Sequence, residues 1–199
     1  MNFLKFNFMN KIIQQTDLKL FLYINGNHNN FWDEIMYLLS STNIWIPLYL
    51  YIIFILYKTY KKKIWICLAT ITIMIIVSDK FSTFLKYYVK QLRPSHEILL
   101  KPIIHLSKAG PGGLYGYVSS HASNFFSLSL FLIILMPSKF TFLKYILITS
   151  SILVSFSRIY NGVHYPMDVI RGILLGAFIG TIFALILKHN KYMNINSAI

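Results

Sequence analysis

Apolar residues gather in long runs that short polar stretches separate. Five of these runs approach the ~20 residues that a membrane-spanning helix requires: 44–57 (extended by 41–43), 64–77, 120–136, 142–156 and 167–187. The second run continues as a helix past Asp79 and Lys80 to about residue 92. An earlier stretch, 12–24, is amphipathic but too short and too polar to span, so we expect it to lie flat on the membrane surface. The pattern predicts an all-α, polytopic membrane bundle of five transmembrane helices plus an N-terminal interfacial helix.

The composition supports a membrane protein and limits its partners. Hydrophobic residues make up 56% of the chain and the net charge is +13, with most basic residues flanking apolar runs. Anionic lipid headgroups are therefore favoured as partners over nucleic acid, and no obligate protein partner is evident. The single cysteine, Cys67, excludes an intramolecular disulfide and a cysteine-based metal site. Without internal repeats or linkers, residues 1–199 are expected to form one domain, and residues 1–19 lack the apolar core of a cleavable signal peptide.

The distribution of lysines predicts the orientation in the membrane. With five spans, the lysines at 58–63, 139, 144, 188 and 191 fall on one side, which is therefore expected to be cytoplasmic. The opposite, extracytoplasmic side of the cytoplasmic membrane then carries the segments 94–117 and 158–166. Three N-terminal lysines also lie on that side, contrary to the tendency of lysines to lie on the cytoplasmic side: Lys5, Lys11 and Lys19. A sixth span near 12–25 would relocate only the first few residues.

The first of three polar clusters on the outer side is KYYVKQLRP, residues 86–94. In a helix, Lys86, Lys90 and Arg93 would lie on one face, and Pro94 marks the expected helix end. Like charges at this spacing repel one another unless an anion lies between them. Taken alone, this stretch favours the alternative of basic side chains that reach the membrane surface.

The second cluster is YVSSHASN, residues 117–124, where the third span begins. Ser119 or Ser120 can cap this helix, and the N–H groups of its first turn form an anion site. His121 lies in that turn, where it could give a proton to a leaving oxygen. A capping serine pair beside a hydrogen-bonded histidine explains the stretch equally well.

The third cluster is SRIYNGVHYPMD, residues 157–168. Arg158 offers a planar fork for two phosphate oxygens. His164 and Asp168 are four residues apart in a helix's first turn, so the carboxylate can orient one imidazole nitrogen and leave the other free to attack. An interfacial arginine with a structural His–Asp pair is the alternative. The topology brings all three clusters to one surface, and together they suit a tetrahedral anion.

The clusters resemble the type 2 phosphatidic acid phosphatase family, whose motifs are K-x6-RP, PSGH and SR-x5-H-x3-D. The first and third match at every defined position, as Lys86 to Pro94 and Ser157 to Asp168. The second reads VSSH, with Val118 in place of proline and Ser120 in place of glycine. The motifs cover residues 86–168, and the span pattern extends the resemblance over most of the chain.

The resemblance implies a role for each matching residue. His164 attacks phosphorus and forms a phosphohistidine, Asp168 orients it, and His121 protonates the leaving lipid oxygen. The phosphoryl oxygens are bound by Lys86, Arg93, Arg158 and the backbone near Ser119 and Ser120. No metal or other cofactor is implied. Metal binding by His121, His164 and Asp168 is an alternative that the surrounding cations disfavour.

The expected function is hydrolysis of membrane lipid phosphates or diphosphates, with undecaprenyl diphosphate as the first substrate. Phosphatidylglycerol phosphate, phosphatidic acid and lipid A phosphate are alternative substrates, and a lipid phosphotransferase is an alternative enzyme. A non-catalytic transporter or lipid-binding subunit could also keep an anion site. The His–Asp pair and His121 argue against that last alternative, because binding needs neither a nucleophile nor an acid.

Overall fold

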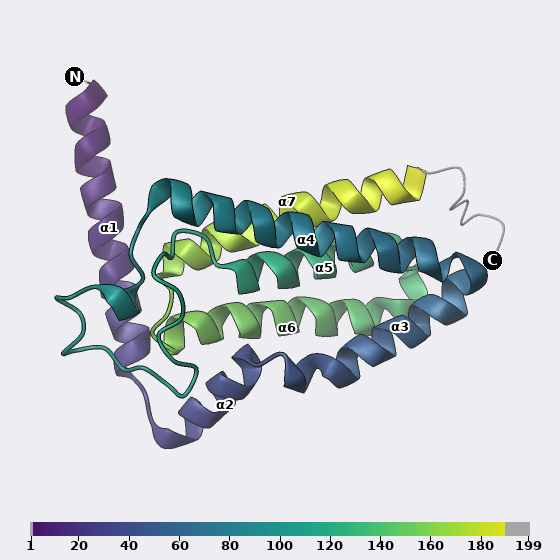
Figure 1. The fold of residues 1–199 in the computed structure, drawn as a ribbon, viewed down its shortest axis with the longest axis horizontal. Helices are drawn as coiled ribbons and strands as arrows, with labels where there is room; N and C mark the ends of the chain where they lie inside the picture. Colours follow the sequence, from purple (N-terminus) through teal and green to yellow (C-terminus); the bar gives the residue numbers. More distant parts are fainter. Residues whose placement is uncertain (1, 190–199) are drawn as a thin grey trace.

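The computed structural model describes the backbone of residues 2–189 and the side chains of residues 12–189. The long helices are α1 (Asn2–Gly26), α2 (Asn30–Ser40), α3 (Ile46–Tyr60), α4 (Ile64–Val89), α5 (Ser120–Leu135), α6 (Thr141–Tyr160) and α7 (Pro166–His189) (Figure 1). Short 3-10 turns, η1 (Asn43–Trp45), η2 (Lys61–Lys63), η3 (Pro94–His96) and η4 (Ser138–Phe140), lie between them. Within the described residues, three helical stretches are long and apolar enough to cross a membrane: Asn43–Val89, which joins α3 to α4, Ser138–Tyr160 and Pro166–His189. The predicted all-α class is confirmed, and these apolar stretches are compatible with a membrane bundle, whereas the number of five spans stays a prediction.

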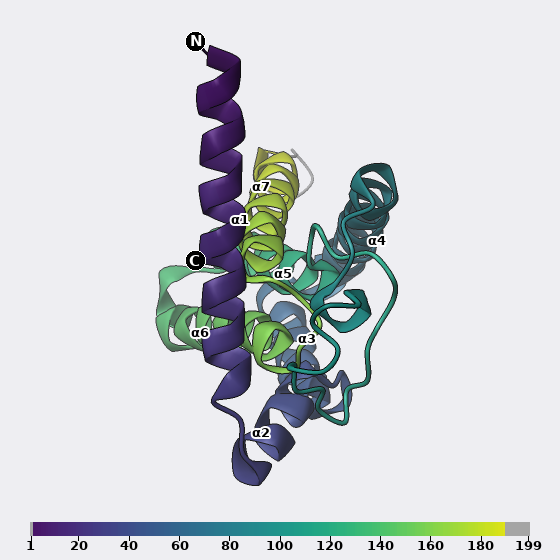
Figure 2. The same ribbon diagram turned by 90° about the vertical axis from the view of Figure 1, so that its left-hand side faces the viewer.

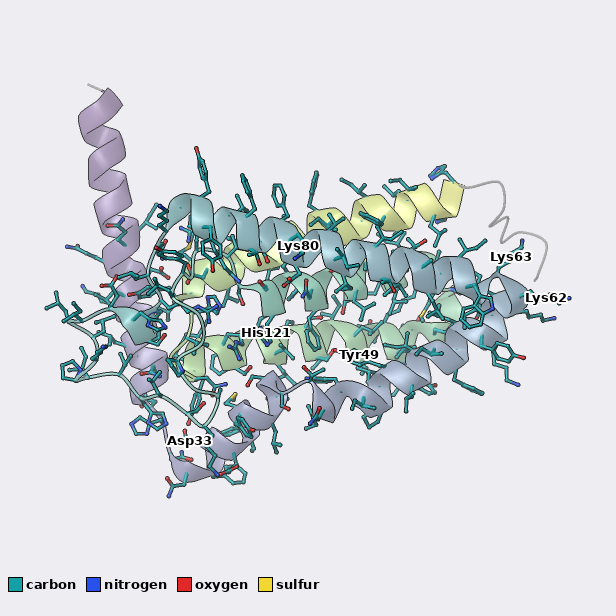
Figure 3. All side chains as sticks on the ribbon, in the orientation of Figure 1. Asp33, Tyr49, Lys62, Lys63, Lys80 and His121 are labelled. Carbon is teal, nitrogen blue, oxygen red and sulfur yellow. The ribbon has the colours of Figure 1, made fainter. Side chains whose placement is uncertain are left out.

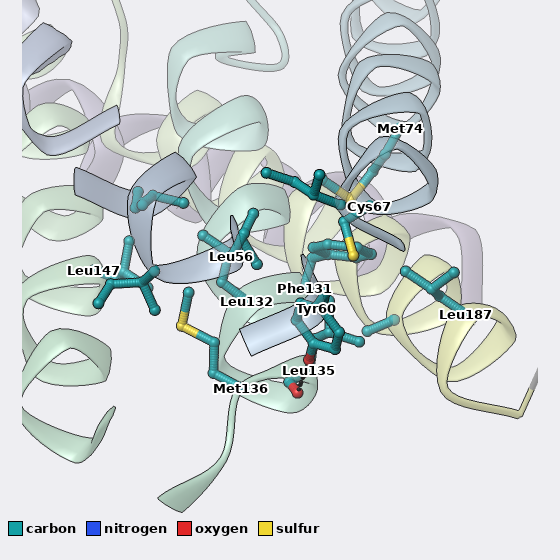
Figure 4. Packing of buried hydrophobic residues seen from close by; sticks show 14 of the residues in the cluster. Leu56, Tyr60, Cys67, Met74, Phe131, Leu132, Leu135, Met136, Leu147 and Leu187 are labelled. Atoms are coloured by element: carbon teal, nitrogen blue, oxygen red, sulfur yellow. Dashed lines mark hydrogen bonds between the residues drawn. The ribbon is translucent and has the colours of Figure 1, made fainter. Parts of the chain in front are cut away.

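Helices α3 to α7 run along the long axis of the molecule, whereas α1 runs across one end of the bundle (Figures 1 and 2). Helix α5 is central and packs against α4, α6 and α7. Apolar side chains from α3 to α7 fill the core, with Leu56, Cys67, Phe131 and Leu132 almost fully buried (Figure 4). Helix α1 joins this assembly through Phe21, which is fully buried with Ile159 and Val169.

The contact between α5 and α7 is a seam of small residues. Small residues recur at every fourth position on both helices, so that Gly172, Gly176 and Gly180 of α7 face Ser119, Ser123 and Ser127 of α5. A Cβ atom at any of these glycines would collide with the backbone oxygen of the facing serine. Membrane helices use such small residues to bring two backbones close together. The seam therefore fixes the first turn of α7 beside the first turn of α5.

Helices α3 and α4 are arranged differently. They are joined by the tight turn η2 and diverge from it along the bundle (Figure 1). Lys62 and Lys63 of this turn lie at one end of the bundle, and Asp33 lies near the other (Figure 3). A cavity lined by residues of α3, α4 and α5, among them Tyr49, Asp79 and Phe125, lies between these helices.

Two helix boundaries differ from the prediction. Helix α4 ends at Val89, before the expected residue 92, and Lys90 adopts a left-handed conformation (φ 55°). The chain then turns back into an isolated antiparallel bridge between Leu92 and Tyr115, which a continuing helix could not form. The predicted single helical face of Lys86, Lys90 and Arg93 is therefore wrong, and the Lys90 side chain is exposed. At the N-terminus, α1 is longer than the expected 12–24.

Candidate active site

The loop after α4 positions Arg93 through its own backbone. The Arg93 N–H donates to the Leu114 carbonyl (3.1 Å) and the Gly116 N–H donates to the Gln91 carbonyl (2.8 Å). The Arg93 Nε–H donates to the Tyr115 carbonyl (3.0 Å), which holds the side chain in a buried position. Gly112, with φ +68°, lies directly against the guanidinium and leaves no room for a side chain. The irregular loop that the glycines predicted thus places Arg93 in the site.

The second motif begins α5. Ser119 is the N-cap residue, a point that the sequence left open, and its Oγ accepts from the Ala122 N–H (3.5 Å). The Ser119 N–H donates to the Asp168 carbonyl (2.9 Å), a bond that the α5–α7 seam makes possible. The first-turn N–H groups of Ser120 and His121 have no carbonyl of a preceding turn to bond, so they are the backbone donors that an anion could use.

Ser120 also ties the first motif to the second. Its Oγ accepts from Lys86 Nζ (2.6 Å) and shares a hydrogen bond with Ser82 Oγ (2.6 Å). This contact holds the lysine of α4 at the N-terminus of α5. Lys86 therefore reaches the site from the last turn of α4, although Lys90 does not.

The third motif forms the turn between α6 and α7. Gly162, with φ +78°, allows the tight turn after α6, and Pro166 starts α7, where it needs no N–H donor. His164 Nδ1 lies 3.2 Å from Asp168 Oδ2, and the two side chains are 1% and 0% exposed. The pair that the spacing predicted is present and buried.

Asp168 makes further hydrogen bonds to groups that are not part of the sequence motifs. Asp168 Oδ2 also accepts from the Tyr165 N–H, while Oδ1 accepts from Gln91 Nε2 and Arg171 Nη1, both at 3.3 Å. The spacing of Arg171, three residues after Asp168, is a signal that could have predicted its contact. Gln91 lies in a loop and gave no comparable signal.

Three cations surround His164. Burial lowers the pKa of His164 well below its ordinary value, and the charges of Arg93, Arg158 and Lys86 lower it further. The lowered pKa favours a neutral imidazole at pH 7, and with Nδ1 directed to Asp168 its Nε2 is the nitrogen that this pair leaves free. The Arg158 side chain is only 7% exposed, and its buried Nε has no hydrogen-bond partner in the part of the chain that the structure describes. A buried guanidinium with an unpaired N–H is costly without an anion nearby.

The structure thus brings all eight predicted site residues together at one end of the bundle: Lys86, Arg93, Ser119, Ser120, His121, Arg158, His164 and Asp168. Their exposure differs, because His164 is buried whereas His121 is exposed. His121 also lines a cavity of about 390 Å³ beside α5. The roles that the family resemblance gives these residues remain predictions.

Outside this site, His28, Asp33 and His105 are a group of metal-ligand residue types whose ligand atoms lie within 4.8 Å of one another. The two imidazole rings stack at 3.7 Å and 5°, so the lone pairs of their nitrogens lie in two parallel planes and cannot both point at one ion. His105 Nε2 lies 2.9 Å from Asp33 Oδ2, and the Tyr160 hydroxyl donates to Asp33 Oδ1 (2.9 Å). These hydrogen bonds connect α2 to the loop between α4 and α5 and to the end of α6.

Comparisons with known proteins identify the family. Residues 62–192 match the PAP2 superfamily. Lipid A 4′-phosphatases of Bacteroides thetaiotaomicron and Porphyromonas gingivalis are 33% and 30% identical, over 88% and 84% of this chain and 78% and 71% of theirs. An undecaprenyl-diphosphatase of Sulfolobus acidocaldarius is 34% identical over 82% of this chain and 74% of its own.

Solved structures agree with this assignment. LpxE of Aquifex aeolicus aligns with a TM-score of 0.64 at 27% identity, over 83% of this chain and 93% of that one. A PAP2-type phosphatidylglycerolphosphate phosphatase of Bacillus subtilis aligns with a TM-score of 0.67 over 91% of this chain and 89% of that one, and its 19% identity supports the fold alone. The family resemblance and the enzyme class predicted from the motifs are confirmed. The chain belongs to the PAP2 superfamily and is a multi-pass membrane phosphatase of lipid phosphates.

Proposed function

We propose that this phosphatase removes a phosphate monoester from lipid A. The observation that carries the proposal is the 33% identity to a lipid A 4′-phosphatase across 88% of the chain. Undecaprenyl diphosphate, the first substrate expected from the sequence, becomes the second candidate, with support from the Sulfolobus relative. Both substrates present a phosphoryl group at the membrane surface, at the end of the bundle where the three motifs meet.

The chemistry would proceed in two steps. His164 Nε2 attacks phosphorus. Asp168 Oδ2 accepts a hydrogen bond from the His164 Nδ1–H and stabilises the positive charge that develops on the ring. The bond from phosphorus to the lipid oxygen breaks, and His121 gives that oxygen a proton. Water then attacks the phosphohistidine, His121 takes its proton, and inorganic phosphate leaves.

The cations and backbone donors would stabilise the transferring phosphoryl group. Arg158, Arg93 and Lys86 surround His164, and the first turn of α5 adds two N–H groups. Charge on the equatorial oxygens is largest in the transition state, so fixed donors here lower the barrier rather than merely bind substrate. No protein-bound metal takes part in this proposal.

We also infer that α3 to α7 each cross the cytoplasmic membrane and that the site faces the extracytoplasmic side. The lysine-rich turn η2 lies at the opposite end of the bundle from the site, as cytoplasmic lysines would (Figure 3). Helix α1 runs across the end that carries the site, an orientation that suits an interfacial helix (Figure 2).

The test is phosphate release from lipid A, undecaprenyl diphosphate and phosphatidic acid by the purified protein, with and without chelator. His164→Ala should abolish release, and His189→Ala, at the far end of α7, should retain it. Full activity of His164→Ala would refute the nucleophile assignment, and loss of wild-type activity in chelator would favour a metal mechanism. Phosphate that appears on an added lipid alcohol instead of in water would identify a transferase.

A further inference from the structure

The cavity beside His121 lies between α3, α4 and α5, in the space where α3 and α4 diverge. Most of its wall is apolar, with contributions from Tyr49, Ile75 and Phe125; Figure 3 labels Tyr49 and His121. The Phe125 ring is held edge-on against Trp45, with ring centroids 5.5 Å apart. The cavity therefore suits an apolar or neutral group more than a free anion.

Asp79 and Asn124 each contribute to this wall a side-chain oxygen with no protein partner among the described residues. The carboxylate of Asp79 makes no hydrogen bond or ion pair with any residue in the described part of the chain. One turn of α5 beyond His121, the buried Asn124 Oδ1 also has no hydrogen-bond partner. Carboxylates within apolar helices are costly and usually mark a functional site. Because a carboxylate has no proton to donate, its missing partner is a hydrogen-bond donor.

The position of the cavity relative to the reaction indicates which part of the substrate enters it. In phosphoryl transfer, the attacking and leaving atoms lie on opposite sides of phosphorus. With His164 on one side, the leaving oxygen points toward its acid, His121, which lines the cavity. The group attached to that oxygen would therefore occupy the space that Asp79 and Asn124 face.

We propose that Asp79 and Asn124 form a subsite for the leaving group, accepting hydrogen bonds from its hydroxyl or amide N–H groups. The inference rests on the lipid phosphatase function proposed above and specifies its substrate class: lipid phosphates whose phosphate is attached to a sugar. The acylated glucosamine of lipid A carries such donors. The polyprenyl phosphate released from a polyprenyl diphosphate carries no N–H and a negative charge, which Asp79 would repel.

Asp79 has one competing role. It lies two helical turns before Lys86 on α4, so its charge could instead support that of the phosphate-binding lysine. The two roles predict different kinetics. A subsite residue changes the preference between leaving groups, whereas a counter-charge for Lys86 affects all phosphate substrates equally.

The experiment measures kcat/KM of the full chain in detergent for lipid A 4′-phosphate and for farnesyl diphosphate. Asn124→Leu should lower the value for lipid A about tenfold and leave farnesyl diphosphate unchanged, because it removes one hydrogen bond. Asp79→Asn should raise the value for farnesyl diphosphate about tenfold by removing a charge repulsion. Lys80→Gln is the matched control, since this exposed neighbour of Asp79 does not line the cavity.

Each outcome decides the question. A lower ratio of lipid A to farnesyl diphosphate activity in both variants, with Lys80→Gln unchanged, supports the subsite. An equal fall on both substrates, or an unchanged ratio, overturns it. A wild-type protein that releases no phosphate from lipid A refutes the proposed substrate instead, so the two failures are distinguishable.

Discussion

The two sides of α5 differ in how tightly they are packed. Toward α7, glycines bring the helix backbones together, and the resulting seam joins Ser119 to Asp168. Toward α3 and α4, the same helix faces a cavity of about 390 Å³ with unpartnered polar groups. One helix thus separates a closely packed region that holds His164, the proposed nucleophile, from an open region that holds His121, the proposed acid.

This difference suggests a division of labour. Phosphoryl transfer requires a nucleophile fixed to within a fraction of an ångström, which the seam provides through backbone contacts. Substrate lipids differ in their leaving groups, and a loosely packed cavity can change its lining without disturbing the nucleophile. Variants on the two sides of α5 should therefore have different kinetic signatures.

Apart from the loss expected for His164→Ala, the largest expected effect comes from the open side. His121→Ala removes the general acid, which should slow the release of lipid alcohols by about 10²–10⁴-fold. A substrate with a good leaving group, such as p-nitrophenyl phosphate, needs no proton and should still phosphorylate His164. Rapid-quench measurement of the phosphoenzyme would check this, and equal losses on both substrates would count against His121 as the acid.

A smaller effect should follow from breaking the seam. Gly176→Val places a side chain against the backbone of Ser123, and overpacking of this kind costs about 1–3 kcal/mol. We expect a lower thermal midpoint in detergent and an equal loss of activity on every substrate. Gly113→Val is the control, because no atom lies within 4 Å of a Cβ there. The same midpoint for both variants would contradict the close contact.

The smallest expected effect is the change of reaction rate with pH. It tests whether His164, on the closely packed side of α5, stays neutral. An imidazole with the ordinary pKa of 6.5 would be about 90% protonated at pH 5.5 and about tenfold less nucleophilic. Because burial and nearby cations lower the pKa of His164, it should stay neutral. Protonation of His164 itself should therefore change the rate of phosphoenzyme formation from p-nitrophenyl phosphate less than twofold between pH 7.5 and 5.5. A tenfold fall in this rate with a midpoint near pH 6.5 would show that His164 keeps the ordinary pKa of a histidine.

The same shift affects stability with a defined sign. Below pH 6.5 the unfolded chain binds a proton at His164 that the folded chain does not. The contribution of this residue to stability is therefore present above pH 6.5 and is lost progressively as the pH falls below it. Thermal midpoints measured at the same pH values would reveal this loss, which His164→Ala should reduce.

The sequence predicted the residues of the site better than the contacts that position them. Motif spacing identified His164 with Asp168, because four residues in a first helical turn dictate their proximity. The sequence pattern predicts a helix end near residue 92, three residues beyond the observed end of α4. The bridge from Leu92 to Tyr115, which accompanies this earlier end, depends on residues far along the chain. The glycines of α7 were visible in the sequence, yet their meaning depends on which helix faces them. Asp79 was visible too, but only the cavity indicates what it could bind.

The contrast between a buried His164 and an exposed His121 has a consequence for the timing of the reaction. In the proposed mechanism, a phosphohistidine formed behind His121 would be shielded from solvent until the lipid alcohol moves away, so the first product would depart before water arrives. The molecule that next enters the cavity decides the fate of the phosphoryl group. Water yields hydrolysis, and a second lipid alcohol that fits would yield transfer, so the residence time of the first product sets the balance between the two.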